Sequence, residues 1–344
     1  MNESVIILAI ESSCDETSAA VLKNDNVLSN IIATQKVHEK YGGVVPELAS
    51  RAHQQHIVPV VQQALAEAEI ELSKVNAIAY TQGPGLMGAL LVGSSFSKSM
   101  AMALNVPLIP VHHMRAHIMA HFIRSSEDQR VPEFPFMCLT VSGGHTQLVL
   151  VKSPIEMEVV GETIDDAAGE ALDKAAKVMG LPYPGGPHVD RLSMDGDALK
   201  YTFTTPQIAG FNYSFSGLKT NLLYFLREKN AADTSFIERE INHICASYQH
   251  VVTDYLIAKL ELAAIHYSVK QIALAGGVSA NSALRTKLVA LCARKEWEAF
   301  IPPMSYCTDN AAMIGISGYY QFLAGQRGAW TDVPQPSWPM KGMP

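Results

Sequence analysis

Two similar stretches of sequence constrain the fold more than any other feature of the chain. In each, an apolar run leads into a short polar or glycine-rich turn, and a second apolar run follows; the stretches are residues 5–22 and 136–151. Short apolar runs bounded by turn residues are typical of buried strands. A strand–turn–strand unit in each half predicts an α/β protein with two similar halves facing a shared cleft.

The turn of each unit has two interpretations. Hydroxyls and carboxylates fill the first turn, Glu11–Thr17, and two glycines lie in the second, Ser142–Thr146. Such groups suit the phosphates of a ligand or the waters of a metal, and glycine lets a backbone approach a ligand closely. An ordinary polar hairpin tip explains the first turn equally well.

A third turn has the strand–glycine–helix order by which a backbone cradles a nucleotide. The apolar run Gln271–Ala275 leads into Gly276–Asn281, and a helix is predicted from there to Cys292. Asn281 is placed to reach a ribose or a base. A single glycine pair after a strand is common, so this interpretation depends on the two turns described above.

Two histidines and a distant carboxylate form a candidate metal site. If Pro110 precedes a helix, His113 and His117 share one face of it, with Cβ atoms roughly 5–6 Å apart. With Asp309 they would make a two-histidine, one-carboxylate set that leaves coordination positions open. Many histidine pairs at this spacing lie on a solvated helix face and bind nothing, so spacing alone leaves both possibilities open.

Composition and charge exclude several classes of protein. The chain has 344 residues, enough for two domains, and its net charge of −7 argues against a non-specific nucleic-acid binder. Five scattered cysteines without a C-x-x-C pair are typical of reduced thiols in the cytoplasm. The apolar run Val5–Ile10 is too short for a signal peptide, and Asn105, Pro107 and Pro110 interrupt later runs, so we expect no membrane span.

Eight motifs, in order along the chain, resemble those of the TsaD family of tRNA N6-adenosine threonylcarbamoyltransferases, once described as O-sialoglycoprotein endopeptidases. They are Glu11–Thr17, Gly42–Arg51, Gly83–Leu86, His113–His117, Val141–His145, Asp165–Glu170, Gly276–Asn281 and Cys307–Asn310. The resemblance covers essentially the whole chain, from about Val5 to Trp338.

The resemblance implies a fold that agrees with the repeated units. The family has the two-lobed actin-like ATPase (ASKHA) fold, with a repeated β-hairpin and a mixed-sheet core in each lobe. Carried over to this chain, the N-terminal lobe comprises residues 1–114 and 309–344, and the C-terminal lobe comprises residues 115–308.

The resemblance also implies a reaction and the residues that serve it. The threonylcarbamoyl group of threonylcarbamoyl-AMP would pass to the N6 amine of adenosine 37 in tRNAs that read codons beginning with adenine, and AMP would be released. One divalent metal per chain, usually Fe²⁺ and sometimes Zn²⁺, would be held by His113, His117 and Asp309. The phosphate of the adenylate would meet Thr140, Val141, Ser142, Gly143 and Gly144; the rest of the adenylate, or ATP or AMP in the same cleft, would meet Asp173, Gly186, Asp190 and Asn281.

Asp15 and Glu16 are the candidates for taking the proton of the amine. One position departs from the family's pattern: the residue between the metal histidines that is often glutamate is Arg115 here. Arg115 is not a metal ligand in the pattern, but it changes the local charge toward the RNA.

The implied partners are tRNA, a TsaB-like paralogue, a TsaE-like ATPase and a TsaC-like enzyme that supplies the adenylate, all in the cytoplasm. A helix with small residues from Gly88 to Ser97 offers a close-packing face for such a partner or for a second copy, so a heterodimer or a homodimer is expected.

Three alternative functions use some of the same features. A zincin-type metalloprotease needs a glutamate directly after its first histidine, and this chain has Met114 there. A small-molecule kinase of the same fold needs a catalytic carboxylate beside its substrate but no histidine pair. A non-catalytic scaffold, like a paralogous partner of the family, needs neither the metal set nor the glycine turns.

Overall fold

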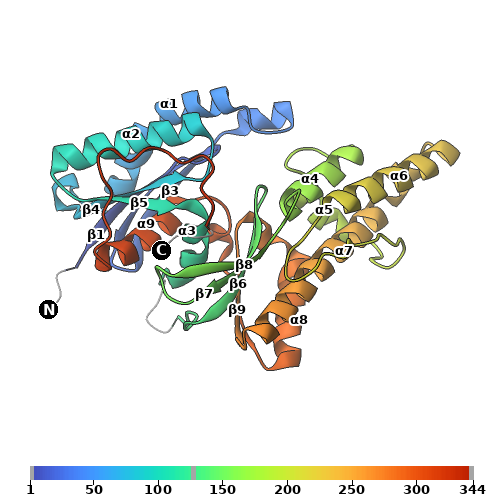
Figure 1. The fold of residues 1–344 in the computed structure, drawn as a ribbon. Coiled ribbons are helices and arrows are strands. Elements are labelled where there is room, and N and C mark those ends of the chain that lie inside the picture. The colour runs from blue at the N-terminus through green and yellow to red at the C-terminus, as the bar shows by residue number, and fades with distance from the viewer. Residues whose placement is uncertain (1–3, 125–128, 341–344) are drawn as a thin grey trace. The chain divides into compact units, whose positions relative to one another are not determined.

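Each half of the chain builds a five-stranded mixed sheet, and the two sheets lie in two compact units (Figure 1). The computed structural model describes residues 4–124 and 129–340. Unit 1 comprises residues 1–134, 151–158 and 302–344, and unit 2 comprises residues 135–150 and 159–301. Along the chain, unit 2 is therefore an insertion into unit 1.

The sheet of unit 1 has the strand order β3-β2-β1-β4-β5. Strands β1 to β3 pair antiparallel, whereas β4 is parallel to β1 and β5 is parallel to β4. The central strand β1 is buried along almost its whole length, which explains its apolar composition. The strands are β1 (Ile6–Glu11), β2 (Glu16–Lys23), β3 (Asn26–Thr34), β4 (Ala77–Gly83) and β5 (Leu108–His112).

The sheet of unit 2 has the order β10-β9-β6-β7-β8, which repeats that of unit 1 when read from the opposite edge. Strand β9 pairs parallel with both β6 and β10, as β4 does with β1 and β5. The predicted α/β chain with two halves of like topology is confirmed. The strands are β6 (Phe136–Val141), β7 (Thr146–Val151), β8 (Met157–Glu162), β9 (Gln271–Ala275) and β10 (Glu298–Phe300).

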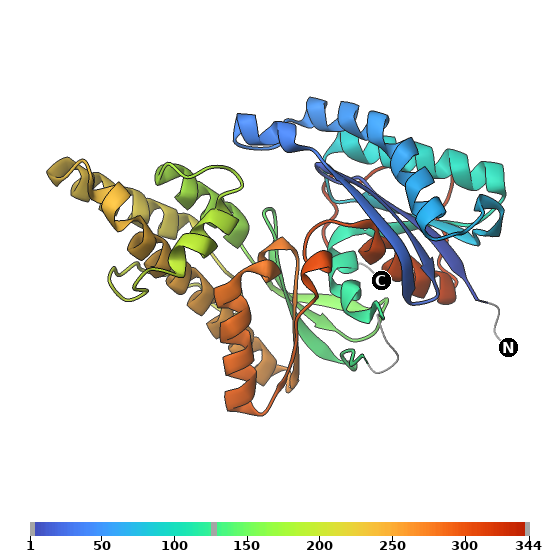
Figure 2. The ribbon, with the colours of Figure 1, turned by 180° about the vertical axis from the view of Figure 1, so that it is seen from behind.

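Helices α1 and α2 cover one face of the unit 1 sheet, and α9 covers the other (Figures 1 and 2). Helix α1 begins at Pro46, because proline in the first turn of a helix removes no hydrogen bond that the helix needs. Short helix α3 follows β5 directly and packs on α9. The bounds are α1 (Pro46–Glu67), α2 (Met87–Leu104), α3 (His113–Met119) and α9 (Ala311–Leu323). Short 3-10 helices are η1 (Lys36–Tyr41), η2 (Leu72–Lys74), η3 (Ala120–Phe122), η4 (Gly277–Ala280) and η5 (Met304–Tyr306).

Helix α2 is long and apolar enough to cross a membrane by length and composition, but its packing makes it a core helix of unit 1. Its small residues face inward, and a side chain at Gly93 would collide with Ser12 of the sheet region. On its outer side Met87, Leu91 and Met102 are exposed. The predicted small-residue face is therefore used within the unit, and the face left open is apolar.

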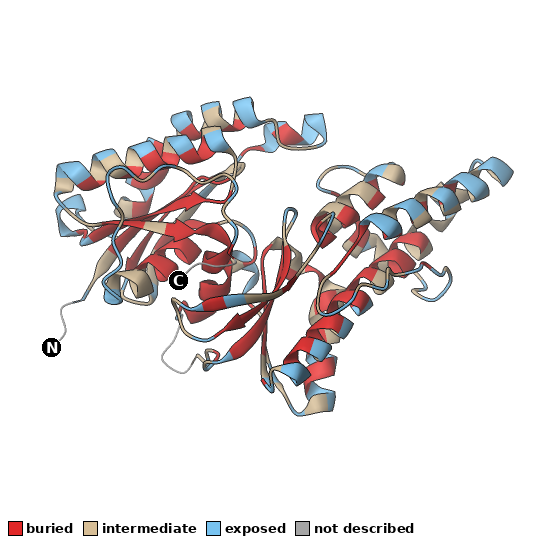
Figure 3. Ribbon diagram, in the orientation of Figure 1, coloured by how far each residue is buried: buried red, intermediate tan, exposed pale blue. Residues whose placement is uncertain are grey.

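Helices in unit 2 gather around the long helix α7 and bury a cluster of aromatic side chains. In Figure 3 the strands of both sheets are mostly buried, while the outer turns of α1 and α6 are exposed. The helices are α4 (Ala168–Val178), α5 (Gly185–Ser193), α6 (Ser216–Ala232), α7 (Phe236–His266) and α8 (Ser282–Lys295).

A carboxylate from a distant segment holds the start of α6. Asp165 accepts hydrogen bonds from the hydroxyls of Ser214 (2.5 Å) and Ser216 (2.7 Å) and from the backbone N–H of Phe215 (2.7 Å). Partial burial raises the pKa of the Asp165 carboxyl, but these hydrogen bonds outweigh it and lower that pKa below its usual range.

The units divide the chain at other points than the predicted lobes. The predicted boundary after residue 114 lies inside α3, and all of α3 belongs to unit 1 because its buried side chains pack on α9. Unit 1 also resumes at Pro302, before the predicted position 309.

The C-terminal segment, Trp330–Met340, runs back along unit 1 as the long red coil of Figure 1. It exchanges two hydrogen bonds with Gln82 at the end of β4: the backbone N–H of Gln335 donates to the Gln82 carbonyl (2.8 Å), and the Gln82 amide donates to the Val333 carbonyl (2.8 Å). A Cβ atom at Gly83 would collide with the carbonyl of Gln335, so glycine there permits this close approach.

Candidate metal centre and glycine turns

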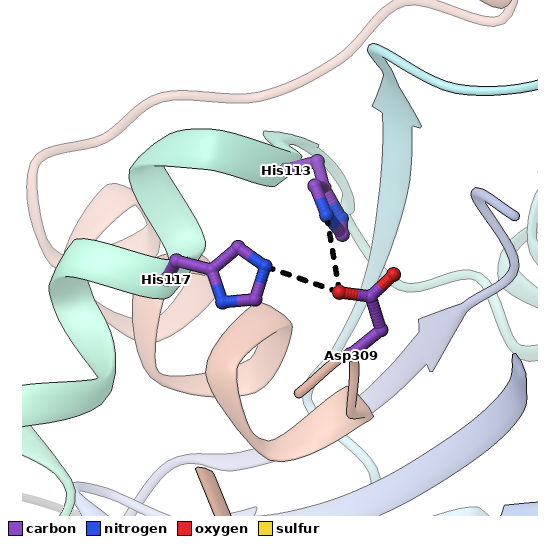
Figure 4. Close-up of side chains that lie close together, drawn as sticks. All are labelled: His113, His117 and Asp309. Carbon is purple, nitrogen blue, oxygen red and sulfur yellow. Dashed lines mark hydrogen bonds and ion pairs between the residues drawn. The ribbon is translucent and has the colours of Figure 1, made fainter. Parts of the chain in front are cut away.

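The predicted metal ligands come together in unit 1. His113 and His117 lie on one face of α3, and their imidazole centroids are 4.8 Å apart (Figure 4). The Oδ1 atom of Asp309 is 3.1 Å from Nε2 of His117 and 3.4 Å from Nε2 of His113. Both histidines are buried and Asp309 is partly exposed.

Caps at two helix starts place these ligands. The Nδ1 atom of His112 accepts the backbone N–H of Met114 (3.2 Å) at the start of α3, which sets the first turn that carries His113. The side chain of Asn310 accepts the N–H of Met313 (3.0 Å) at the start of α9, so Asp309 stands just before that helix.

The spacing of the three side chains fits a divalent metal. Ligand atoms bound at about 2.0–2.1 Å around a tetrahedral centre lie about 3.4 Å apart, and the two nitrogens lie 3.1 and 3.4 Å from the aspartate oxygen. Imidazole nitrogen with one carboxylate suits iron or zinc rather than calcium or magnesium. The site also favours positive charge: burial alone would lower the pKa of His113, but Asp309 and Glu11 hold that pKa well above its usual value.

Glu11 contacts the ring nitrogen of His113 that faces away from Asp309. Its Oε2 atom is 3.1 Å from Nδ1 of His113 and accepts the hydroxyl of Thr81 (2.6 Å), while Oε1 accepts the N–H of Ser13 (2.5 Å). A carboxylate on the far nitrogen of a metal-binding histidine fixes the ring's orientation and tautomer. Sequence reasoning placed Glu11 only in a polar turn; a carboxylate at the end of a buried strand was the available signal.

The candidate bases Asp15 and Glu16 lie in and after the turn between β1 and β2. Burial, with Asp309 and Asp15 nearby, raises the pKa of Glu16 to about 9. The buried His53 anchors the turn: its ring contacts the carbonyl of Cys14 (2.9 Å) and the hydroxyl of Thr17 (2.7 Å).

Arg115 is 6% exposed, so its side chain lies within unit 1 and not on the surface. Its guanidinium donates to the carbonyl of Ile155 (3.4 Å), and burial lowers its pKa. Within the described residues, its Nε and Nη2 atoms have no hydrogen-bond partner.

In unit 2 the glycine turn after β6 leaves its backbone open. The N–H of Ser142 donates to the carbonyl of His145 (2.8 Å), which closes the turn. Neither Gly143 nor Gly144 has positive φ, and a Cβ atom at either would meet nothing within 4 Å. The described parts of the chain therefore do not require glycine there, whereas a ligand on the backbone would. Thr140 and Val141 are fully buried in β6, so their side chains stay within the core.

The second glycine turn lies beside the first, because β6 and β9 are adjacent and parallel. Thr140 pairs with Ala275, and Gly276, with φ +84°, packs on the carbonyl of Val141. Turns at the carboxyl ends of adjacent parallel strands are where open α/β sheets bind ligands.

Four predicted adenylate residues form two clusters. The Oδ1 atom of Asp173 accepts the N–H groups of Gly185 (2.8 Å) and Gly186 (2.9 Å), which ties α4 to the start of α5. Burial raises the pKa of the Asp173 carboxyl.

The other cluster is joined by Gln249 of α7, which sequence reasoning missed. The Nε2 amide of Gln249 donates a hydrogen bond to Oδ1 of Asp190 (3.0 Å), and its Oε1 atom accepts a hydrogen bond from the Nδ2 amide of Asn281 (2.8 Å). Asn281 also caps α8 by accepting the N–H of Leu284 (3.0 Å). Asp190 and Asn281 are thus oriented together, and each already holds structural bonds.

Comparison with known proteins places these features in context. The family model described as TsaD, tRNA N6-adenosine threonylcarbamoyltransferase, matches residues 26–316. Proteins with that name from Cytophaga hutchinsonii and Porphyromonas gingivalis are each 56% identical to this chain. The first match covers 97% of this chain and 96% of its own, and the second covers 94% and 96%.

Solved structures agree on the fold. HypF in its phosphate- and nucleotide-bound form superposes with a TM-score of 0.63 at 12% identity, over 94% of this chain and 47% of HypF. With the repeated order of the two mixed sheets, this likeness identifies the actin-like ATPase fold.

Proposed function

The chain belongs to the TsaD family of tRNA N6-adenosine threonylcarbamoyltransferases, and we propose from this premise how its residues divide the reaction. The enzyme transfers a threonylcarbamoyl group to the N6 amine of an adenosine in tRNA. We propose that the donor is threonylcarbamoyl-AMP, that the acceptor is adenosine 37 of tRNAs reading codons that begin with adenine, and that AMP is released. The observation that carries the proposal is the convergence of His113, His117 and Asp309.

The metal site would hold one Fe²⁺ or Zn²⁺ ion. When bound, the ion supplies a Lewis acid or template for oxygen atoms of the donor. His113, His117 and Asp309 bind it, and Glu11 holds the His113 ring in the orientation that binding needs.

The two glycine turns of unit 2 are proposed to hold the adenylate. The N–H of Ser142 closes the turn, and the N–H groups of Gly143 and Gly144 stabilise negative charge on the departing phosphate, a contribution of about 10²–10³ in rate for one such donor elsewhere. Asp190 and Asn281, oriented by Gln249, face the nucleoside, while Asp173 and Gly186 keep the start of α5 in place.

The transfer forms one bond and breaks one. The N6 amine attacks the carbonyl carbon of the mixed anhydride, the bond from that carbon to the phosphate oxygen breaks, and AMP leaves with the electron pair. The amine proton passes to a base. Asp15 and Glu16, at the turn between β1 and β2, are the candidates for this base.

Partner proteins are proposed to complete the tRNA site. Contacts with phosphates supply most of the affinity of a protein for nucleic acid, and the net charge of −7 on this chain repels a polyanion such as tRNA at long range. The exposed Met87, Leu91 and Met102 of α2, with Val58 of α1 nearby, form an apolar face that suits a TsaB-like paralogue or a second copy. A TsaE-like ATPase and a TsaC-like enzyme would act with it in the cytoplasm.

The test is a transfer assay with purified proteins. Threonylcarbamoyl-AMP and unmodified tRNA are supplied, each partner is omitted in turn, and the modified nucleoside is quantified. The His113→Ala, His117→Ala double variant is expected to lose bound metal and product, whereas His188→Ala, a half-buried histidine of unit 2, keeps both. Full metal content in the double variant would contradict the site. Full turnover by wild type without partners would contradict the partner proposal.

No observation favours the metalloprotease. Position 114, where a zincin carries its glutamate, is a methionine that is 1% exposed.

A further inference from the structure

We propose that the C-terminal segment, Trp330–Met340, is a positioning element of the metal centre and acts through His112. The segment follows helix α9 and contributes none of the three proposed metal ligands. Its Trp338 nevertheless contacts His112, the residue next to His113. This inference rests on the proposed metal role of His113, His117 and Asp309.

His112 joins the segment to the metal helix through both of its ring nitrogens. Nε2 lies 2.8 Å from the carbonyl oxygen of Trp338, and Nδ1 accepts the N–H of Met114 (3.2 Å) at the start of α3. Since a carbonyl can only accept and an N–H can only donate, these two partners fix one tautomer, with the proton on Nε2. The Trp338 ring adds a contact at 4.9 Å between centroids.

The segment itself is tied to the sheet and to α2. Besides the two bonds with Gln82, the carbonyl of Pro336 accepts the N–H of Gly85 (3.2 Å), and Lys98 of α2 donates to the carbonyls of Trp330 and Asp332. These bonds hold the Trp338 carbonyl at a fixed place relative to β4 and β5.

The position of α3 matters because this helix is only seven residues long and carries both histidines. A helix this short is not stable by itself, so its orientation depends on its cap and its packing. His112 is the cap, and Trp338 orients the His112 ring. Loss of the segment removes the contact of Nε2 with the Trp338 carbonyl, so the His112 ring and the start of α3 are held less firmly in one geometry.

The experiment measures binding of Co²⁺, which substitutes in sites of this ligand type and absorbs visible light according to its coordination. Wild type is expected to bind one Co²⁺ per chain. The chain ending at Ala329 and the His112→Ala variant should each bind about tenfold more weakly, with altered visible spectra, as when other residues that orient metal ligands are removed. Combining the two changes should weaken binding no further than either alone, because the segment acts through His112.

Matched controls separate positioning from general stability. The chain ending at Met340 keeps the anchors that the described residues make and should bind Co²⁺ as wild type does. Trp338→Ala keeps the carbonyl that accepts from His112 and removes only the ring contact, so it should weaken binding less than His112→Ala does. Trp330→Ala in the same segment should leave binding unchanged, since its ring is exposed. His112→Asn should restore part of the affinity lost in His112→Ala, because asparagine also caps helices.

Two results would overturn the inference: wild-type affinity and spectrum in the chain ending at Ala329, or fully additive losses in the combined variant. If the chain ending at Ala329 does not fold, wild-type affinity and spectrum in His112→Ala overturn it instead. If wild type binds no Co²⁺, the proposed metal site fails and this inference fails with it.

Discussion

Glu11 and His113 are separated by 102 positions in the sequence, yet the carboxylate Oε2 of Glu11 lies 3.1 Å from Nδ1 of His113. The strand order brings them together. Strand β1 ends in Glu11, and β5, which lies one strand away on the other side of β4, leads directly into α3 with His113 at its start. The candidate metal centre is therefore supported by the sheet and not by α3 alone.

We expect Glu11→Gln to reduce metal affinity by about 10–100-fold, because the neutral amide no longer favours the tautomer and charge of a metal-bound imidazole. The shape of the side chain is conserved, so the fold should remain intact. Competition for Zn²⁺ with a chromophoric chelator measures the change, and the exposed Glu67→Gln is the matched control. Equal affinities of the two variants would show that Glu11 is only structural.

Gly144→Val should weaken binding of AMP by at least about tenfold without changing thermal stability. The reason is that a side chain there meets nothing in the described chain but projects where a ligand would approach the backbone. Calorimetric titration with AMP provides the affinity. Gly217→Ala, which makes only an ordinary contact in α6, should leave both properties unchanged. Unaltered AMP binding in Gly144→Val would argue against a ligand on this turn.

Two substitutions at Asn281 should separate its cap from its amide. Asn281→Ala removes both functions and should lower the free energy of unfolding by about 1 kcal/mol as well as the affinity for AMP. Asn281→Ser keeps a capping oxygen, so it should retain most of the stability while AMP binding still falls by about tenfold. Urea unfolding and calorimetry report the two quantities. If the serine variant binds AMP like wild type, Asn281 has no ligand role.

Asp165→Asn should destabilise unit 2 by about 1 kcal/mol at pH 7, because hydrogen bonds to a charged acceptor are stronger than those to a neutral amide. Its pKa is lowered in the folded protein, so its contribution is fully present above its unfolded pKa of about 3.9 and is lost as pH falls through the lower folded value. The difference in thermal midpoint between wild type and variant should therefore shrink below about pH 4. A constant difference from pH 7 to pH 3 would contradict this assignment.

Local patterns in the sequence were enough to predict the repeated sheets and the shared helix face of His113 and His117. Apolar runs that alternate with turn residues predict strands, and the i, i+4 spacing of His113 and His117 predicts that they share one helix face. The roles of Glu11, Gln249 and the Trp338–His112 contact could not be predicted from such patterns, because each depends on residues brought together by strand order or helix packing. Gln249 in particular lies in mid-helix, where its position along the chain carries no sign of its partners.

The insertion of unit 2 into unit 1 has a consequence for synthesis on the ribosome. Unit 2 is complete at residue 301, but α9, which covers one face of β1, β2 and β4, lies at residues 311–323. We therefore expect unit 2 to fold first, while one apolar face of the unit 1 sheet stays uncovered until α9 is made. Asp309 is translated after the whole of unit 2, so the candidate metal centre can form only once residue 309 has left the ribosome. Protease digestion of stalled nascent chains of increasing length would reveal this order, and early protection of β1 to β5 would refute it.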